Sequence, residues 1–378
     1  MEVMTVEPLR ILVFDAQGGP MFALPYSSCE WLDSISEPGS LDVKVVYSDV
    51  ALRVPAGLFA VMRVWGVILA AVRGRDVVHA GWLTGYQWDP KTATLDLQCG
   101  GGWSILSKRL VMSHRLDSSW RDGDVFIDQD HPAGDWLLEL RGSYRDIASG
   151  LVREAMKWGA LPFDLPPVDG GSAHDLPYAG YDLATTADRL SDLAGREDGD
   201  EIRMDPVLSG GGRLSWLLRS EPEIVDHMYT ADGLGVLTAM APGQRVMLTG
   251  VKGEGASMTG QVYAAGGKDQ DRTLMCRAGE GIPGLPLLQS KDTEHTTVSD
   301  LDTLRRHARD DLAYGGRPDV TYGLDVGQET PLAPGDWVDV QVDDLFLGPR
   351  LLRLKVTDVS GSSGSDWTTV QARERVMS

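Results

Sequence analysis

The chain has 378 residues, of which 42% are hydrophobic and 24% charged, and its formal net charge is −20, from 55 acidic and 35 basic residues. This length predicts two or three domains of ordinary size. The acidic balance, without a long cluster of lysine or arginine, argues against a free-standing nucleic-acid-binding protein. Three cysteines, Cys29, Cys99 and Cys276, lack metal-ligand spacing. We therefore expect reduced thiols in a protein assembled in the cytosol.

Neither secretion nor membrane anchoring is expected. The N-terminus has an early glutamate and no basic region before an apolar core, unlike a signal peptide. The most apolar stretch, GLFAVMRVWGVILAAV (57–72), is interrupted by Arg63 and is too short to cross a bilayer.

The first hundred residues are dominated by strand patterns. Strands are expected at 9–15, 41–47, 77–88 and 92–99, where β-branched and aromatic residues are frequent. Asp89-Pro90-Lys91 predicts a turn that joins the last two strands as an antiparallel hairpin. A short helix is expected at 103–110, after Gly101 and Gly102.

The middle of the chain predicts helices. Residues 143–158 have Ser143 as a helix cap and an apolar face that includes Ile147 and Leu151. Residues 160–182 are rich in proline and are expected to form an exposed loop. A second helix is expected at 183–197.

Strand patterns then return at 201–207, 213–220, 244–252, 257–265, 319–326, 336–344, 350–360 and 366–375. A helix is expected at 303–315, with Leu301, Leu304, Ala308 and Leu312 as its apolar stripe.

The stretch LTGVKGEGAS (248–257) partly matches a phosphate-binding loop. Gly250, Gly255 and Ser257 fit the frame, but Ala256 occupies the lysine position. The flanking segments are strand-like, whereas a phosphate loop runs into a helix. We therefore expect a hairpin turn, in which Gly253 and Gly255 can take positive φ.

No motif argues for catalysis or metal binding. The seven histidines (79, 114, 131, 174, 227, 295 and 307) are scattered. An EF-hand-like loop starting at Asp122 would have Ala133 in place of the terminal glutamate. Lys108-Arg109 and Arg305-Arg306 are interpreted as helix-end or interface charges. No catalytic, cofactor-binding or metal-binding residue is therefore predicted.

Three blocks of sequence resemble a known family when they are taken in order. They are VHAGWLTGYQWDPKTATLDLQCGGGWSILSKR (78–109), ATTADRLSDLAGREDGDEIRMDPVLSGGGRLSWLLR (184–219), and SDLDTLRRHARDDLAYGGRPDVTYGLDV, PLAPGDWVDVQV and RLLRLKVTDVS within 299–360. These blocks are similar to the tail-tip hub proteins, or minor tail proteins, of siphoviruses that infect actinobacteria. Residues 111–182 and 266–298 match no pattern of that family.

The resemblance implies a mainly β (α+β) fold, similar to the baseplate hub of contractile tails. It implies two small antiparallel β-barrel tube-like domains and an inserted mixed α/β domain. Residues 1–110 would form the first barrel and 111–197 a helical or mixed outer domain with the proline-rich loop 160–182. Residues 198–378 would form the second barrel from 198–265 and 299–378, with a variable insertion near 266–298.

The resemblance also implies a structural, non-enzymatic role at the tail tip of a virion, after assembly in the host cytoplasm. Three copies would form a ring that continues the tail tube and lines the DNA exit channel. Partners would be the distal tail or tail tube protein, the tape measure protein and the central fibre or adhesin proteins. Genomic DNA would pass an acidic lumen without specific binding, because carboxylates repel its phosphates.

Two other functions remain open from the residues alone. A tail-associated cell-wall hydrolase could use a carboxylate pair such as Asp122/Asp124 or Asp135/Glu139. A host glycan-binding module could use surface tryptophans such as Trp120 and Trp136. Eleven tryptophans are many for this length, and a buried core is the alternative location for each.

Overall fold

The computed structural model describes residues 8–49, 54, 57–121, 124–125, 136–171, 174–196, 198–269, 272–293 and 300–374. The chain divides into a larger unit, Met1–Leu248 with Leu324–Ser378, and a smaller unit, Thr249–Gly323. The chain passes from one unit to the other within β17 (Val246–Glu254) and β21 (Asp319–Gly327).

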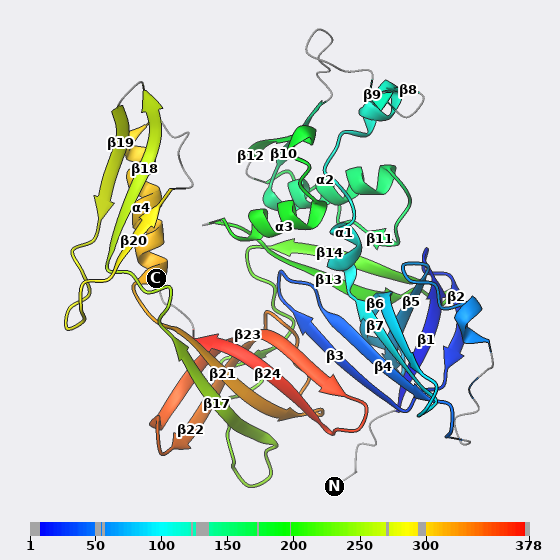
Figure 1. Cartoon of the computed structure of the whole chain (residues 1–378). Coiled ribbons are helices and arrows are strands. Elements are labelled where there is room, and N and C mark those ends of the chain that lie inside the picture. The colour runs from blue at the N-terminus through cyan, green and yellow to red at the C-terminus, as the bar shows by residue number, and fades with distance from the viewer. Residues whose placement is uncertain are drawn as a thin grey trace. The chain divides into compact units, whose positions relative to one another are not determined.

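The larger unit is built around one long, mainly antiparallel sheet (Figure 1). Its strand order is β17-β21-β24-β23-β3-β4-β7-β6-β5-β1-β2, with β22 beside β23, and β15 and β16 beside β22. Beyond β17 and β21, these strands are β1 (Leu9–Asp15), β2 (Pro20–Leu24), β3 (Ser28–Ser34), β4 (Ser40–Val46), β5 (Val67–Arg73), β6 (Asp76–Asp89), β7 (Thr94–Gly100), β15 (Met228–Tyr229), β16 (Leu237–Thr238), β22 (Trp337–Asp344), β23 (Gly348–Ser362) and β24 (Trp367–Glu374).

Strand β5 explains the most apolar stretch of the sequence. Every residue from Val67 to Val72 is buried, because both faces of the strand are covered. On one face Val67, Leu69 and Ala71 pack with residues of β1, β3, β4 and β7. On the other face Ile68 and Ala70 pack with helices and with a second sheet. The apolar run is therefore a doubly covered strand.

A layer of helices and short strands covers this second face. The helices of this layer are α1 (Gly102–Leu106), α2 (Tyr144–Lys157) and α3 (Thr186–Ala194), with short 3-10 helices at His114–Ser119 and Gly180–Asp182. The 3-10 helix Leu58–Ala60 packs through Leu58 on the opposite face of the long sheet. The strands are β8 (Trp120–Arg121), β9 (Asp124–Val125), β10 (Leu137–Gly142), β11 (Phe163–Asp164), β12 (His174–Ala179), β13 (Glu201–Leu208) and β14 (Leu214–Glu221). Ser143 and Thr185 each begin a helix with a capping box, which pairs N–H groups that the first turn leaves free.

Strand β23 joins the strands from the two ends of the sequence. Its first half pairs with β22, and Asp358–Ser362 then pairs with β3 along the same edge. Gly361 lies opposite Trp31, where a Cβ atom would approach the indole ring to 2.5 Å. The mainly β fold is confirmed, whereas the described strands continue into one another and do not close into two separate barrels.

In its described residues, the smaller unit contains a three-stranded sheet and one helix. The sheet order is β19-β18-β20, with β18 (Gln261–Asp269), β19 (Arg272–Ala278) and β20 (Gln289–Asp292). Helix α4 (Leu301–Gly315) packs on one face, where Leu304 and Ala308 meet Val262 and Ala264. The predicted apolar stripe of this helix is therefore confirmed at its two central positions.

Two local predictions were wrong. The segments 244–252 and 257–265 do not pair as a hairpin, because β17 belongs to the long sheet and β18 to the three-stranded sheet. Gly253 lies within β17, and neither Gly253 nor Gly255 has positive φ. The proline-rich stretch 160–182 is not only loop, because β11 pairs with β14, and β12 pairs with β10.

The other predicted elements occur close to their expected positions. The predicted hairpin of 77–88 and 92–99 is β6 with β7, and the predicted short helix is α1. Among the described residues, no helix combines the length and the apolar character needed to cross a membrane.

Candidate functional site

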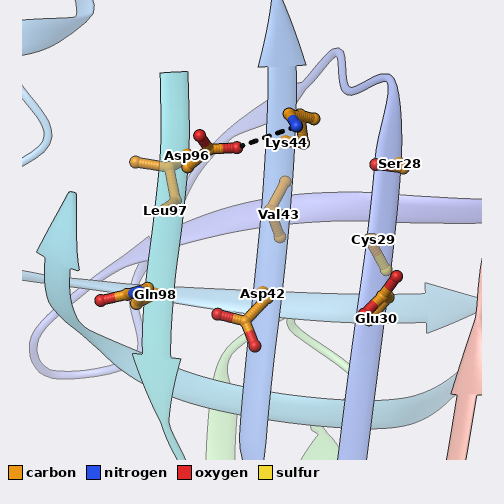
Figure 2. A pocket seen from close by; sticks show the side chains of 9 residues that line it. All are labelled: Ser28, Cys29, Glu30, Asp42, Val43, Lys44, Asp96, Leu97 and Gln98. Carbon is orange, nitrogen blue, oxygen red and sulfur yellow. Dashed lines mark ion pairs between the residues drawn. The ribbon is translucent and has the colours of Figure 1, made fainter. Parts of the chain in front are cut away.

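The first candidate site is a polar face on strands β3, β4 and β7 (Figure 2). Alternation in these strands buries Cys29, Val43 and Leu97 and turns the intervening polar residues outward. The face is hollowed into an open depression of about 270 Å³. The residues that line it are Ser28, Cys29, Glu30, Asp42, Val43, Lys44, Asp96, Leu97 and Gln98.

The outward side chains of this polar face form two rows across the strands (Figure 2). Asp42 lies between Glu30 and Gln98, and Lys44 lies between Ser28 and Asp96. Lys44 forms an ion pair of 3.7 Å with Asp96, in which both side chains are about half exposed. Three carboxylates and one ammonium group give the face an excess of negative charge.

The carboxylates of this face affect one another. Partial burial raises the pKa of Asp42, and the charge of Glu30 directly opposite raises it further. Beneath them, burial raises the pKa of the Cys29 thiol to about 12 and also raises that of Cys99. These thiols are unreactive at neutral pH, since the thiolate is the nucleophile. All three cysteines are free, as expected from their spacing.

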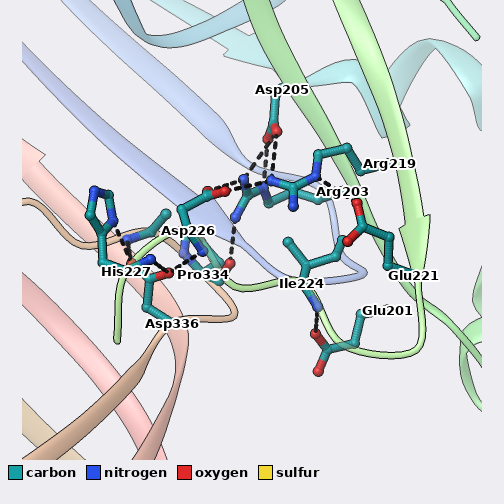
Figure 3. Close-up of polar contacts among 11 residues, drawn as sticks. Glu201, Arg203, Asp205, Arg219, Glu221, Ile224, Asp226, His227, Pro334 and Asp336 are labelled. Carbon is teal, nitrogen blue, oxygen red and sulfur yellow. Dashed lines mark hydrogen bonds and ion pairs between the residues drawn. The ribbon is translucent and has the colours of Figure 1, made fainter. Parts of the chain in front are cut away.

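The second candidate site is a network of ion pairs between β13, β14 and two loops (Figure 3). The Arg203 side chain is 5% exposed and forms ion pairs with Asp205 and Asp226. It also donates a hydrogen bond of 2.7 Å to the Pro334 carbonyl. Arg219 binds the other oxygen of Asp226 at 2.6 Å. The hydrogen bonds to these carboxylates raise the pKa of Arg203, although burial opposes the rise.

Asp336 anchors the loop next to this network. Its fully buried carboxylate accepts hydrogen bonds from the backbone N–H groups of Asp226, His227 and Ala333, at 2.7–2.8 Å. The His227 ring nitrogen Nδ1 lies 3.0 Å from the same carboxylate. A buried carboxylate that gathers several donors holds its segments in one arrangement. The network therefore fixes the loop after β14 to the start of β22, and its geometry is structural.

A small cavity of about 10 Å³ lies beside this network, with room for roughly one water molecule. It is lined by Asp33, Arg203 and the nearly buried His79, among others. Neither ring nitrogen of His79 has a hydrogen-bond partner among the described residues. Burial lowers the pKa of His79 to about 4 and raises that of Asp33 to about 7, although the charge of Arg203 opposes the latter.

The stretch LTGVKGEGAS lacks the geometry of a phosphate loop. Strand β17 ends at Glu254, and the following turn leads into strand β18, whereas a phosphate loop leads into a helix. Lys252 forms an ion pair with Glu254 within the same strand at 2.8 Å.

One arginine of each basic pair makes local contacts. Arg109 donates hydrogen bonds to the carbonyls of Trp158 and Gly159, just after the end of α2. Arg305 pairs with Asp302 one turn earlier in α4, at 3.1 Å. Within the described residues, no group of three or more His, Cys, Asp and Glu side chains could hold a metal ion.

Several candidate residues of the alternative functions lie outside the described residues. These are Asp122 and Asp135, together with Ala133 and most of the aspartate-rich loop. The described Glu139 lies 3.8 Å from Arg141 in an exposed ion pair on β10. The ring of Trp136 packs edge-on against that of Tyr181 at 6.5 Å. These contacts favour neither a hydrolase nor a glycan site.

Neither candidate site was predicted from the sequence, for different reasons. The polar face could have been found from the alternation in SCEWLDS (28–34), although nothing in that segment shows which strands lie beside it. The ion network could not have been found from the sequence, because its members come from distant segments around residues 203, 226 and 336. Trp82 and Trp216 are in the core, which was the alternative location for the tryptophans.

Comparison with known proteins gives similarity only at the level of structure. No family model matches the chain, and no curated protein matches it. A tail protein from Neisseria meningitidis has a TM-score of 0.57 at 14% identity, covering 97% of both chains. The 43 kDa tail protein of prophage MuSo2 from Shewanella oneidensis has a TM-score of 0.55 at 12% identity, covering 97% of this chain and 98% of its own.

A third solved structure is similar over nearly the same extent. Prophage tail protein gp18 from Listeria monocytogenes has a TM-score of 0.51 at 9% identity, over 98% of this chain and 95% of that one. The chain therefore has the fold of phage tail proteins, along nearly its whole length. The family resemblance predicted from the sequence is confirmed at the level of the fold.

Proposed function

We propose that this chain is a structural protein of a phage tail, and that it acts as a hub at the tail tip. The observation that carries the proposal is the similarity to three phage tail proteins over almost the full length of each. Fold similarity alone does not assign a function, so the proposal also needs support from the sites.

The proposed assembly is a ring of three copies that continues the tail tube. Residues 1–110 form one tube domain, and residues 198–265 with 299–378 form the other, so that a trimer presents six similar sheets to a hexameric tube. In this proposal the two tube domains of one copy meet where β3 pairs with β23. A closed ring also covers exposed strand edges such as that of β2.

In this proposal the polar face on β3, β4 and β7 lines the channel. Glu30, Asp42 and Asp96 would present negative charge to the DNA, which carries about one negative charge per 1.7 Å of duplex. Like charges keep the duplex from adhering to the wall while it moves. Genomic DNA therefore passes without specific binding.

The protein works without catalysis, and its partners are the other tail components. These are two further copies of itself, the distal tail or tail tube protein, the tape measure protein, and the central fibre or adhesin proteins. The site of action is the virion tail tip, after assembly in the host cytoplasm. The structural character of the buried ion network and the unreactive thiols support a role without chemistry.

The test is the copy number and position of the protein in intact particles. Quantitative mass spectrometry of purified virions should give three copies per tail, and antibody labelling should mark the tail tip in electron micrographs. Absence from the particle would refute a tail role. A clear dimer or hexamer would refute the trimeric hub while leaving a tail role in place.

A further inference from the structure

The smaller unit carries a basic and aromatic row on one face of its sheet. Strand β18 pairs Tyr263 with Lys291 of β20 on one side and with Arg277 of β19 on the other. Cross-strand partners project from the same face of a sheet. Lys291, Tyr263 and Arg277 therefore form a row across the three strands, which we call the basic row.

The basic row faces away from helix α4. Val262 and Ala264, the neighbours of Tyr263 in β18, are buried against the helix. Because side chains alternate along a strand, Tyr263 points to the opposite face. The Tyr263 and Met275 side chains are 37% and 62% exposed, and both cations are exposed as well. Among the residues that the structure describes, neither Lys291 nor Arg277 forms an ion pair, and both charges face solvent.

Hydrogen bonds to neighbouring side chains hold the tyrosine of the basic row in place. Its hydroxyl donates a hydrogen bond of 3.0 Å to the Gln261 side-chain oxygen. The same oxygen accepts a bond of 2.6 Å from the Gln289 amide. Gln261 is itself nearly buried, which fixes these contacts. An exposed ring with a fixed hydroxyl is a preorganised contact surface.

The charge of the smaller unit differs from that of the rest of the chain. Residues 249–323 contain nine basic and eleven acidic residues, a net charge of −2, whereas the other residues have 26 basic and 44 acidic ones, a net charge of −18. The basic row is thus a local cationic surface on a nearly neutral unit. Two cations are too few for a nucleic acid, whose binding proteins commonly neutralise about six to ten phosphates.

We propose that the basic row binds an extended acidic segment of a partner protein. Adjacent strands are about 4.8 Å apart, which places the two cations roughly 10 Å from each other. An extended chain in the polyproline II conformation rises about 3.1 Å per residue and returns to the same side every third residue. Carboxylates three residues apart therefore match the cations, and the residues between them lie over Tyr263 and Met275.

This inference goes beyond the proposed tail role and does not depend on it. It specifies the chemistry of the partner segment: acidic side chains at every third position, extended backbone and apolar residues between. Strands β19 and β20 are the edges of this sheet among the described strands, so such a segment can continue past the row. The partner is identified here by this pattern alone.

The test uses the full chain and a labelled synthetic peptide with a repeated Glu-Pro-Pro sequence. Binding followed by fluorescence anisotropy should be saturable, and it should weaken about tenfold or more in the double variant Arg277→Glu, Lys291→Glu. The matched control is Arg306→Glu, Arg309→Glu on the exposed side of α4, which makes the same charge change and should bind like the parent. Unchanged unfolding curves for both variants exclude a loss of folding.

Three other results would overturn the proposal. The first is equal binding of a Lys-Pro-Pro peptide or of a peptide with the same composition and adjacent glutamates. The second is tighter binding of oligo(dT), which would assign the row to nucleic acid. The third is self-association that the double variant abolishes while the acidic peptide does not bind, which would assign the row to a second copy.

Discussion

The rings of Trp82 and Trp216 stack with their centroids 4.3 Å apart and their planes 14° apart. Trp82 lies in β6 of the long sheet and Trp216 in β14 of the second sheet, so the stack joins two layers. Both side chains are almost completely buried. Phe163 completes the group, with its ring 5.9 Å from that of Trp216.

Truncation of this stack should destabilise the larger unit strongly. Replacement of a buried tryptophan by alanine removes contact area and leaves a cavity, so Trp216→Ala should lower the free energy of unfolding by about 3–5 kcal/mol. Urea denaturation followed by circular dichroism measures the change. The control is Trp88→Ala, since Trp88 is 46% exposed and should cost much less. Equal effects of the two substitutions would contradict the role of the stack.

Removal of Arg203 should also be costly. The variant Arg203→Met keeps the length of the side chain but removes the positive charge that balances the carboxylates of Asp205 and Asp226 in a partly buried site. Breaking such a pair from one side typically costs about 3–5 kcal/mol. The exposed pair of Arg141 and Asp175 provides the control, because Arg141→Met should cost less than about 1 kcal/mol. Thermal unfolding of both variants is the measurement.

Asp33 should make stability depend on pH in an unusual direction. Burial raises its pKa to about 7, so the folded protein holds this proton more tightly than the unfolded chain does. Its contribution to stability is therefore present at about pH 4, near the unfolded pKa, and is lost as the pH rises towards 7. The variant Asp33→Asn cannot ionise, and its stability relative to the parent should increase over this range by about 3–4 kcal/mol, since each pKa unit corresponds to about 1.4 kcal/mol.

The measurement is a urea unfolding series of the parent and the Asp33→Asn variant between pH 4 and pH 8. His79 has a pKa lowered to about 4 by burial, and its contribution to stability is lost as the pH falls from about 6.5 through 4. Because His79 is present in both the variant and the parent, its contribution cancels in the difference between their free energies of unfolding. If the variant is the less stable protein at pH 8, the attraction between Asp33 and Arg203 outweighs burial and the prediction is wrong.

On the polar face, Glu30 and Asp42 should repel each other, and a neutral substitution of Asp42 should relieve this repulsion. Glu30 and Asp42 lie directly opposite each other on neighbouring strands, and like charges in that position destabilise a sheet. Asp42→Asn should therefore raise the free energy of unfolding at pH 7 by about 0.5 kcal/mol at low salt. The gain should shrink in high salt, where exposed charges are screened. A loss of stability at low salt would show that Asp42 is held by attraction.

The sequence predicted the positions of individual helices and strands better than it predicted which strands pair with each other. Ser143 and the spacing of Ile147 and Leu151 were enough to locate α2, because a helix is set by residues within a few turns. The expected hairpin of β17 and β18 was wrong because adjacent strand patterns with glycines between them do not specify pairing. The doubly buried β5 lacks alternation, so it could not be told from other apolar segments.

The sites depended on contacts between distant parts of the chain. The basic row requires the register of three strands, and its residues lie at 263, 277 and 291 without a recognisable motif. The ion network likewise unites Arg203 with the loop at Pro334. Pattern reasoning finds the alternation within each strand, whereas register and neighbours come from tertiary packing.

The pairing of β3 with β23 has a consequence for biosynthesis. Ser34 donates a hydrogen bond of 2.6 Å to Asp358, which lies 324 positions later in the chain. A ribosome that adds about 5–20 residues per second needs roughly 15–65 s to cover that distance. Throughout this time a nascent chain has an unpaired edge at β3, where another nascent chain could attach. Translation of the last strands therefore sets the earliest moment at which the polypeptide is protected from premature association.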